Sequence, residues 1–148
     1  MMPQHQESKI LPYSADQMFD LVAAIDRYPE FLPWCKEAHL VSVRKDKIVA
    51  DLVVGTKLFH EKFTSEVTLE RPRAIIVHYR SGPLSHLSNK WLFTAVGGKN
   101  SKKCQVDFEV DFDFRSPLLR AAMNVFFDKA FRKMMGAFED HARFLYGN

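Results

Sequence analysis

Hydrophobic and polar positions alternate along the second half of the chain, and the alternation is clearest in residues 104–114 (CQVDFEVDFDF). From Val106 to Phe114 every second residue is apolar, and every residue between them is acidic. Strict alternation predicts a strand with one buried and one solvated face, as in antiparallel sheets. The apolar positions are Val106, Phe108, Val110, Phe112 and Phe114, and the acidic positions are Asp107, Glu109, Asp111 and Asp113.

A period of two also runs through earlier segments, which we predict to be strands. Turn residues separate these segments, including Lys45–Asp46 inside a hairpin, Gly82–Pro83 and Gly97–Gly98. The predicted strands are residues 6–12, the two halves of 39–55, then 59–70, 73–82 and 87–98. In 59–70 the apolar face carries Phe59, Phe63, Val67 and Leu69.

A helical period replaces the alternation after the first strand. Ser14 and Gln17 have the spacing of a capping box, and Tyr13 and Met18 have that of a hydrophobic staple. We therefore predict a helix from Ser14 to about Ile25. The proline-bounded run DRYPEFLP, residues 26–33, predicts a second, short helix.

The chain closes with one long predicted helix over residues 117–146. Ser116 followed by Pro117 is a typical helix start, and Gly147 is a plausible C-cap. Its apolar stripe consists of Leu119, Ala122, Met123, Phe126, Phe127, Ala130, Phe131, Met134, Phe138 and Leu145.

These elements predict the α+β class. An antiparallel sheet must bury one face, and residues 117–146 are the element long and apolar enough to cover it. We expect a curved sheet of about six to seven strands wrapped around the long C-terminal helix, with two short helices after the first strand. Such an arrangement leaves room for a cavity between helix and sheet. No repeat or linker interrupts residues 1–148, so we predict a single domain.

Composition adds the expectation of a ring-lined pocket, because 148 residues include 13 Phe, 4 Tyr and 2 Trp. The net charge of +3 is small and dispersed, which argues against dedicated DNA binding. We expect no membrane span, since no apolar run approaches ~20 residues, and no signal peptide, since MMPQHQESKI at the start lacks a charged region followed by an apolar one. The two cysteines follow no metal-binding or disulfide spacing, which fits the cytoplasm.

Few residues suggest catalysis or metal binding. Neither Cys35 nor Cys104 has an evident base beside it, and both are interpreted as packed side chains. The run HEKFT, residues 60–64, lacks the second histidine of a zinc helix and lies in a strand pattern. Glu61 shares the parity of Phe63 there, so it is either a rim residue or a polar anchor for a ligand head group.

The acidic positions of residues 104–114 are predicted to form a solvated face rather than a cation site. Same-face neighbours on a strand are about 6.8 Å apart, too far to share one ion easily. Cross-strand partners such as Lys9 and Lys90 explain these carboxylates better. We therefore predict neither a metal site nor catalytic residues.

The aromatic and methionine side chains of the last helix have two interpretations: they form either the hydrophobic core or an adaptable pocket wall. They occupy more than one side of the predicted helix. Gly136 is interpreted as allowing close packing on the sheet or leaving room for a ligand. The candidate wall residues are Phe126, Phe127, Phe131, Met134 and Phe138.

Two segments resemble a known family. YPEFLPWCKEA, residues 28–38, and GPLSHLSNKWLF, residues 82–93, are similar to the signature segments of the coenzyme Q-binding START-like proteins. That family is grouped with the polyketide cyclase/dehydrase-like proteins and the ribosome-association toxin. The resemblance covers roughly residues 5–146 and implies a helix-grip (START-like) fold. One difference is Leu84, where relatives often carry Phe.

The resemblance implies a non-catalytic binding protein or chaperone for ubiquinone or a related polyprenyl lipid, supporting coenzyme Q function in respiration. It needs no cofactor, since the lipid is the bound ligand. Tyr28, Phe31, Pro33, Trp34 and Cys35 would form the cavity mouth. Together with Phe63 and the helix wall, the second segment would add ligand-binding residues: Leu84, Leu87, Trp91 and Phe93, with Gly82 and Pro83 at the rim.

Two other functions stay open. One is a toxin-like protein that binds the ribosome and interferes with subunit joining. The other is a cyclase/dehydrase-type enzyme with Glu61, His78 or His86 as acid or base. For the preferred lipid carrier we also expect transient membrane contact through the basic side of the last helix, on the inner face of the membrane.

Overall fold

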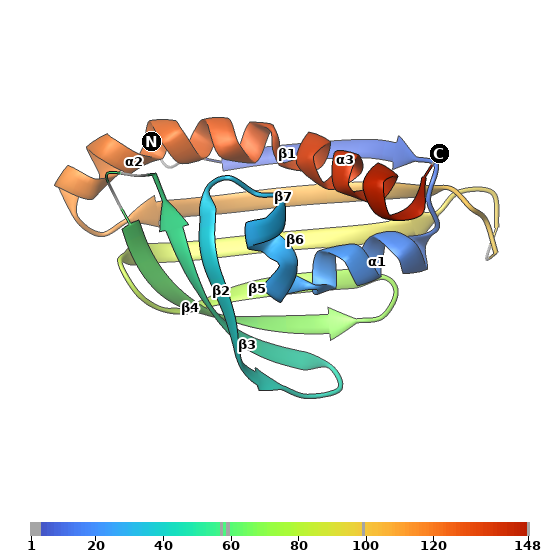
Figure 1. The fold of residues 1–148 in the computed structure, drawn as a ribbon, viewed down its shortest axis with the longest axis horizontal. Coiled ribbons are helices and arrows are strands. Elements are labelled where there is room, and N and C mark those ends of the chain that lie inside the picture. Colours follow the sequence, from blue (N-terminus) through green and yellow to red (C-terminus); the bar gives the residue numbers. More distant parts are fainter. Residues whose placement is uncertain (1–3, 57, 59, 99, 148) are drawn as a thin grey trace.

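The fold is a curved, seven-stranded antiparallel sheet with helices on its concave side (Figure 1). The computed structural model describes residues 4–56, 58, 60–98 and 100–147, so Phe59 lies outside the described residues. The strand order is β1-β7-β6-β5-β4-β3-β2. The strands are Gln4–Leu11 (β1), Cys35–Val43 (β2), Lys47–Gly55 (β3), His60–Glu70 (β4), Ala74–Ser81 (β5), Leu84–Ala95 (β6) and Cys104–Phe114 (β7).

The helices lie where the sequence predicts them. Figure 1 shows the two C-terminal helices following one another along β1 and β7, while α1 lies across the other part of the concave face. This arrangement confirms the predicted α+β class and its curved antiparallel sheet. The helices are Ala15–Ala23 (α1), Ile25–Glu30 (η1, a 3₁₀-helix), Pro117–Arg132 (α2) and Met134–Tyr146 (α3).

The start of α1 confirms the predicted capping box. Gln17 N–H donates to Ser14 Oγ over 3.1 Å, and Ser14 N–H donates to Gln17 Oε1 over 3.0 Å. Tyr13 and Met18 are both buried, as the hydrophobic staple requires. The helix ends at Ala23 rather than near Ile25, because Ile25 is already the first residue of η1.

The alternation along β7 predicts its two faces correctly over most of its length. Val106, Phe108 and Phe112 are buried on the concave face, where they meet the helices. The opposite face of β7 carries half-buried and exposed acidic side chains up to Asp111. The hydrophobic core therefore lies between the concave face and the helices, which is where a ligand cavity can form.

The C-terminal helix differs from the prediction because it is divided at Lys133. The backbone N–H of Lys133 is shared between Lys129 O and Ala130 O, each at 3.2 Å, which tightens the turn. Met134 and Met135 are both buried just after this turn. Gly136 was interpreted as allowing close packing on the sheet or as leaving room for a ligand, and both interpretations are wrong. It is exposed, and an added Cβ there would meet no atom within 4 Å.

Asp113 was expected on the solvated face but is buried, with 7% of its surface exposed. The start of α2 covers it and supplies its partners. Arg120 Nε lies 3.1 Å from its Oδ1, and Asn124 Nδ2 donates to the same oxygen over 3.3 Å. Phe114 N–H donates to it as well. Asp113 thus fixes α2 to the end of β7.

The expected pairing of Lys9 with the acidic face of β7 is also wrong. Lys9 lies opposite Val106, so its side chain is on the concave side of the sheet. There its Nζ lies 2.5 Å from Glu139 Oε1 of α3. Lys90 does lie opposite Glu109, as expected.

Replacing Asp113 with alanine is expected to lower the free energy of unfolding by about 2 kcal/mol near neutral pH, because charged hydrogen bonds are lost. Burial works to raise the pKa of Asp113, but the hydrogen bonds from Asn124, Phe114 N–H and Arg120 outweigh it, and the pKa is lowered. A lowered pKa in the folded state stabilises the protein above the unfolded-state value of about 3.9. Urea unfolding should therefore show a difference from wild type that is constant above about pH 5 and shrinks as the pH falls below 4. A difference that persists unchanged at pH 3 would contradict this.

Candidate ligand-binding pocket

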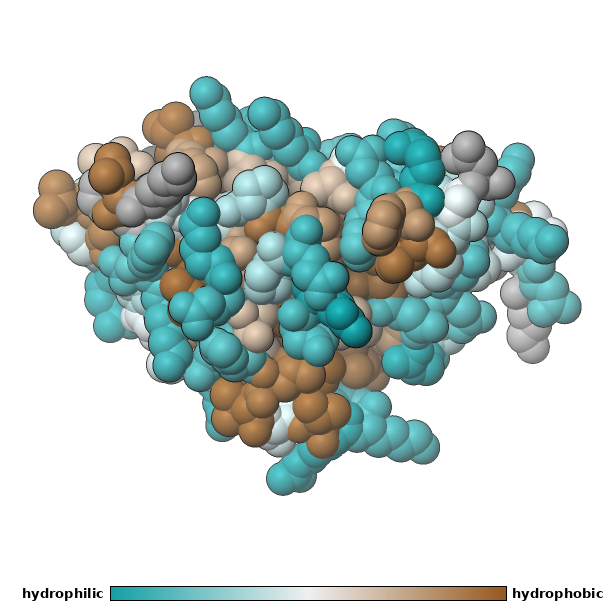
Figure 2. Space-filling view, in the orientation of Figure 1, coloured by the Kyte–Doolittle hydropathy of each residue, from teal (hydrophilic) through white to brown (hydrophobic). Residues whose placement is uncertain are grey.

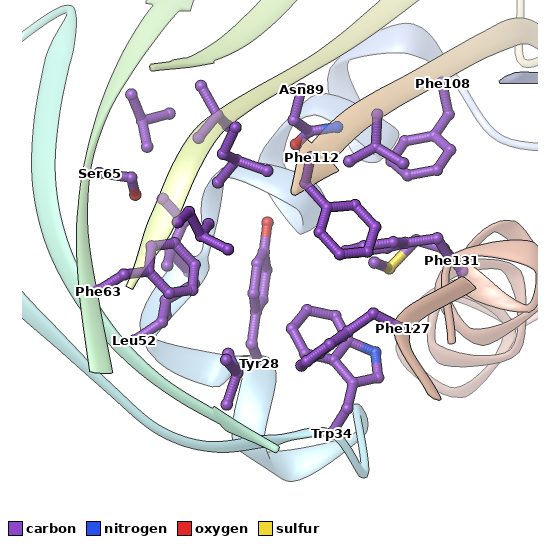
Figure 3. Close-up of a pocket in the computed structure, with 18 of the residues that line it drawn as sticks. Tyr28, Trp34, Leu52, Phe63, Ser65, Asn89, Phe108, Phe112, Phe127 and Phe131 are labelled. Carbon is purple, nitrogen blue, oxygen red and sulfur yellow. The ribbon is translucent and has the colours of Figure 1, made fainter. Parts of the chain in front are cut away.

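A cavity of about 100 Å³ lies between the concave face of the sheet, η1 and the C-terminal helices (Figure 3). By the same measure one water molecule needs roughly 10–15 Å³, so the space would hold several. Its wall is formed mainly by aromatic and aliphatic side chains from η1, five of the strands and both C-terminal helices. A cavity of this kind favours an apolar guest.

Ten of the fourteen residues predicted to bind a ligand line this cavity. They come from segments far apart in the sequence: the η1 region, β4, β6 and the C-terminal helices. The ten are Tyr28, Trp34, Phe63, Leu84, Leu87, Trp91, Phe127, Phe131, Met134 and Phe138.

The remaining four, Phe31, Pro33, Phe93 and Phe126, are not among the lining residues. Phe31 stacks on His141 of α3, with ring centroids 3.9 Å apart. Phe93 points to the concave side, where it packs edge-on against Phe19 of α1 and stacks on Trp91. These four side chains are thus not part of the described cavity wall, and their contact with a ligand stays a prediction.

The cysteines are packed side chains, as the sequence suggests. Cys35 is buried, and its Sγ lies 3.6 Å from Glu37 O. Burial raises the pKa of Cys35 to about 12 and that of Cys104 to about 11. Neither thiol is ionised near neutral pH, so neither is an activated nucleophile.

Tyr28 and Trp34 hold the η1 region against the rest of the wall. The hydroxyl of Tyr28 donates to Val22 O, and burial raises its pKa far above the ordinary value. The Trp34 ring lies edge-on to the rings of Phe127 and Phe131, at centroid distances of 6.2 and 5.9 Å. These contacts connect the proline-rich segment to α2.

Several other wall residues carry no signal of a ligand site in the sequence. They are inward-facing positions of strands, and alternation predicts the apolar face of β4 and β7 to which three of them belong. Which buried positions meet the cavity depends on the course of the helices, which the strand pattern does not specify. These residues include Leu52, Val54, Val67, Ile75, Val110 and Phe112.

Of the three acid–base candidates, only Glu61 lines the cavity. His78 is exposed and lies opposite Glu66, on the convex face of the sheet. His86 Nε2 lies 3.1 Å from Asp111 Oδ1, also on the convex face. Proposals that use His78 or His86 in cavity chemistry are therefore wrong.

No group of three or more His, Cys, Asp or Glu residues in the described ranges is placed to hold a metal ion. Among the helices that the structure describes, none is long and apolar enough to cross a membrane.

Residues 11–139 match the family described as polyketide cyclase/dehydrase and lipid transport. The chain is 34% identical over 142 residues to the ribosome association toxin RatA of Pseudomonas aeruginosa, covering 96% of each chain. It is 35% identical over 148 residues to coenzyme Q-binding protein COQ10 homolog B, mitochondrial, of Xenopus laevis, covering 97% of this chain and 59% of that one.

The Zhui aromatase/cyclase of Streptomyces sp. R1128 has a similar structure, with a TM-score of 0.81 at 16% identity. The match covers 97% of this chain and 94% of that one. At this identity the likeness shows the fold alone, which is the helix-grip arrangement predicted from the sequence.

Proposed function

Because the chain belongs to the polyketide cyclase/dehydrase and lipid transport family, we propose that it binds a polyprenyl quinone such as ubiquinone, or a related isoprenoid lipid. The protein acts as a non-catalytic carrier or chaperone that supports coenzyme Q function in respiration. The observation that carries this proposal is the cavity lined by aromatic and aliphatic side chains. The similarity to a coenzyme Q-binding protein over nearly the whole chain supports it.

Apolar burial is large enough for useful affinity. Each buried methylene-sized group contributes ~0.8 kcal/mol, so a five-carbon isoprene unit contributes about 4 kcal/mol before ordering costs. Two or three units therefore suffice for micromolar binding, which corresponds to about −8 kcal/mol. A cavity of about 100 Å³ is too small for a long tail, so most of such a tail would extend beyond it.

The described lining residues contain two titratable side chains, Tyr28 and Glu61. The hydroxyl hydrogen of Tyr28 is already donated to Val22 O, so it is not available to a substrate. A carrier needs no acid–base pair, and the proposal assigns no catalytic residue.

The proposal is tested with purified protein. Organic extraction followed by mass spectrometry should recover a quinone or another isoprenoid lipid. A ubiquinone with a two-isoprene tail should bind with micromolar affinity, and quenching of Trp34 and Trp91 fluorescence should report it, because both rings line the cavity. Protein that retains no such lipid and shows no saturable quenching would refute the proposal.

A toxin-like action on the ribosome is the second candidate, because the chain is 34% identical to the Pseudomonas aeruginosa toxin along 96% of both chains. Polysome profiling after overexpression separates the two candidates. Accumulation of free ribosomal subunits would favour the toxin-like action, and an unchanged profile would exclude it.

For a lipid carrier, α2 is the proposed surface for transient contact with anionic membranes. Leu118 and Val125 are 79% and 67% exposed on this helix, and Figure 2 shows hydrophobic side chains at the end of the molecule where α2 lies. Residues 115–133 contain five basic residues and one acidic residue, a net +4, whereas the whole chain carries only +3. The rest of the protein is thus slightly acidic, and this difference in charge supports docking through α2, which we propose to occur from the cytoplasmic side.

Replacing both Lys129 and Lys133 with alanine is expected to weaken binding to phosphatidylglycerol vesicles about 30-fold, because each charge contributes about 1 kcal/mol at the membrane surface. Vesicle co-sedimentation at low salt measures the change. The control replaces the exposed Lys102 and Lys103 of the β6–β7 connection, and it should bind as wild type does. Equal losses in both double variants would show that only the net charge matters.

A further inference from the structure

Two polar side chains interrupt the apolar concave face at the cavity. Ser65 of β4 and Asn89 of β6 both line the cavity, and both lie at inward-facing positions of their strands. The inward neighbours two residues away on the same strands are Phe63, Val67, Leu87 and Trp91, all of which line the cavity.

Ser65 and Asn89 lie on either side of β5. Asn89 is opposite Val77, and Ser65 is opposite Tyr79, the next inward position of β5. With strands ~4.8 Å apart and same-face positions ~6.8 Å apart, their Cα atoms are about 12 Å from each other. Figure 3 shows both side chains beside the cavity, so both can contact one ligand inside it.

The hydrogen bonds of Asn89 determine which atom it presents. Its Nδ2 donates to Glu109 O over 2.8 Å, and a backbone carbonyl can only accept. The amide nitrogen is therefore held at Glu109, and Oδ1 is the atom that faces the cavity (Figure 3). Asn89 thus offers a ligand a hydrogen-bond acceptor.

Ser65 offers a hydroxyl, which can donate or accept. The residue is only 2% exposed, and it lines the cavity. A hydroxyl on an otherwise apolar wall is unfavourable unless it is hydrogen-bonded, and alanine or valine would pack there without that disadvantage. Ser65 and Asn89 are therefore suited to a polar part of a ligand inside an otherwise apolar cavity.

We propose that Ser65 and Asn89 bind the ring oxygens of the head group and favour the reduced, hydroxyl-bearing quinol over the quinone. This inference rests on the proposed function. A quinol hydroxyl donates to Asn89 Oδ1, whereas a quinone carbonyl would place an acceptor against that acceptor. The Ser65 hydroxyl serves either form at the other end of the ring. The protein supplies no electrons, and the preference is one of binding alone.

The test compares a two-isoprene ubiquinone with its borohydride-reduced quinol under argon, using the fluorescence of the two tryptophans. The quinol is expected to bind wild-type protein about tenfold more tightly. Preferential binding of the reduced form raises the midpoint potential of the bound pair above that of the free pair, by about 30 mV for a tenfold preference. Redox titration of the complex measures this shift independently.

Variants separate the roles of the two residues. Asn89→Leu should bring the two affinities to within about twofold, and Ser65→Ala should weaken both forms. Ser88→Ala, an exposed serine next to Asn89, is the matched control and should retain the tenfold preference.

Equal affinities for the two forms in wild-type protein would overturn the subsite while leaving the carrier function intact. A tenfold preference that persists in Asn89→Leu would also overturn it. If neither form binds, the proposed function fails and the subsite fails with it. Should Asn89→Leu not fold, the wild-type affinities and the midpoint potential decide the matter.

Discussion

Replacing Phe138 with alanine should lower the free energy of unfolding by about 3–5 kcal/mol, because it leaves an empty space among the rings that surround this buried side chain. Phe138 is 1% exposed. Its ring lies edge-on to those of Tyr28, Phe31 and Trp91, at centroid distances of 5.5, 5.1 and 4.9 Å. It therefore joins three elements, η1, β6 and α3, and its loss removes contacts with each.

Thermal and urea unfolding measure the effect, and a decrease of roughly 10 °C in Tm is expected for a chain of this size. Phe144→Ala is the matched control, since Phe144 lies on the same helix and is 82% exposed. It should change the unfolding free energy by no more than about 0.5 kcal/mol. A loss below about 1.5 kcal/mol for Phe138→Ala would show that the surrounding rings close the cavity.

Local patterns in the sequence were sufficient to predict the elements. The capping box at Ser14 and Gln17 fixes the start of α1 because both hydrogen bonds are made within four residues. The alternation in β7 predicts its buried face because successive side chains of any strand point in opposite directions. The fold class follows from such local rules, and the similarity to solved structures confirms it.

Features that depend on distant contacts were not predictable in the same way. Asp113 continues the solvated pattern of β7, yet α2 covers it because Arg120 and Asn124 reach it from the next helix. Lys9 was matched to the wrong partner because the register of β1 against β7 places it on the side of α3. A pattern in one strand carries no information about which helix lies over it.

The cavity was predicted only in part for the same reason. Phe93 points to the concave face of the sheet, as the other predicted wall residues of β6 do, but α1 occupies that face beside it. Ser65 received no role, because a serine within a strand pattern has no distinguishing signal until its neighbours are known to be apolar. Its burial at the cavity wall is visible only in the folded chain.

Replacing Leu87 with aspartate is expected to weaken the binding of a two-isoprene ubiquinone at least 100-fold. Leu87 lines the cavity from β6 and is half-buried there, so a substitution need not prevent folding. The short side chain of aspartate cannot reach water as lysine can. An apolar guest would have to displace the water around the carboxylate, which costs several kcal/mol, and 2.7 kcal/mol already corresponds to 100-fold.

Leu87→Asn separates charge from shape, because asparagine has nearly the same size as aspartate and no charge. It should weaken binding by about tenfold, and Leu40→Asp on the exposed part of β2 should have no effect. Fluorescence titration of the folded variants gives the three affinities, with thermal unfolding as the check on folding. If Leu87→Asp binds as tightly as Leu87→Asn, the lipid does not enter the cavity, and its apolar contacts must lie elsewhere on the molecule.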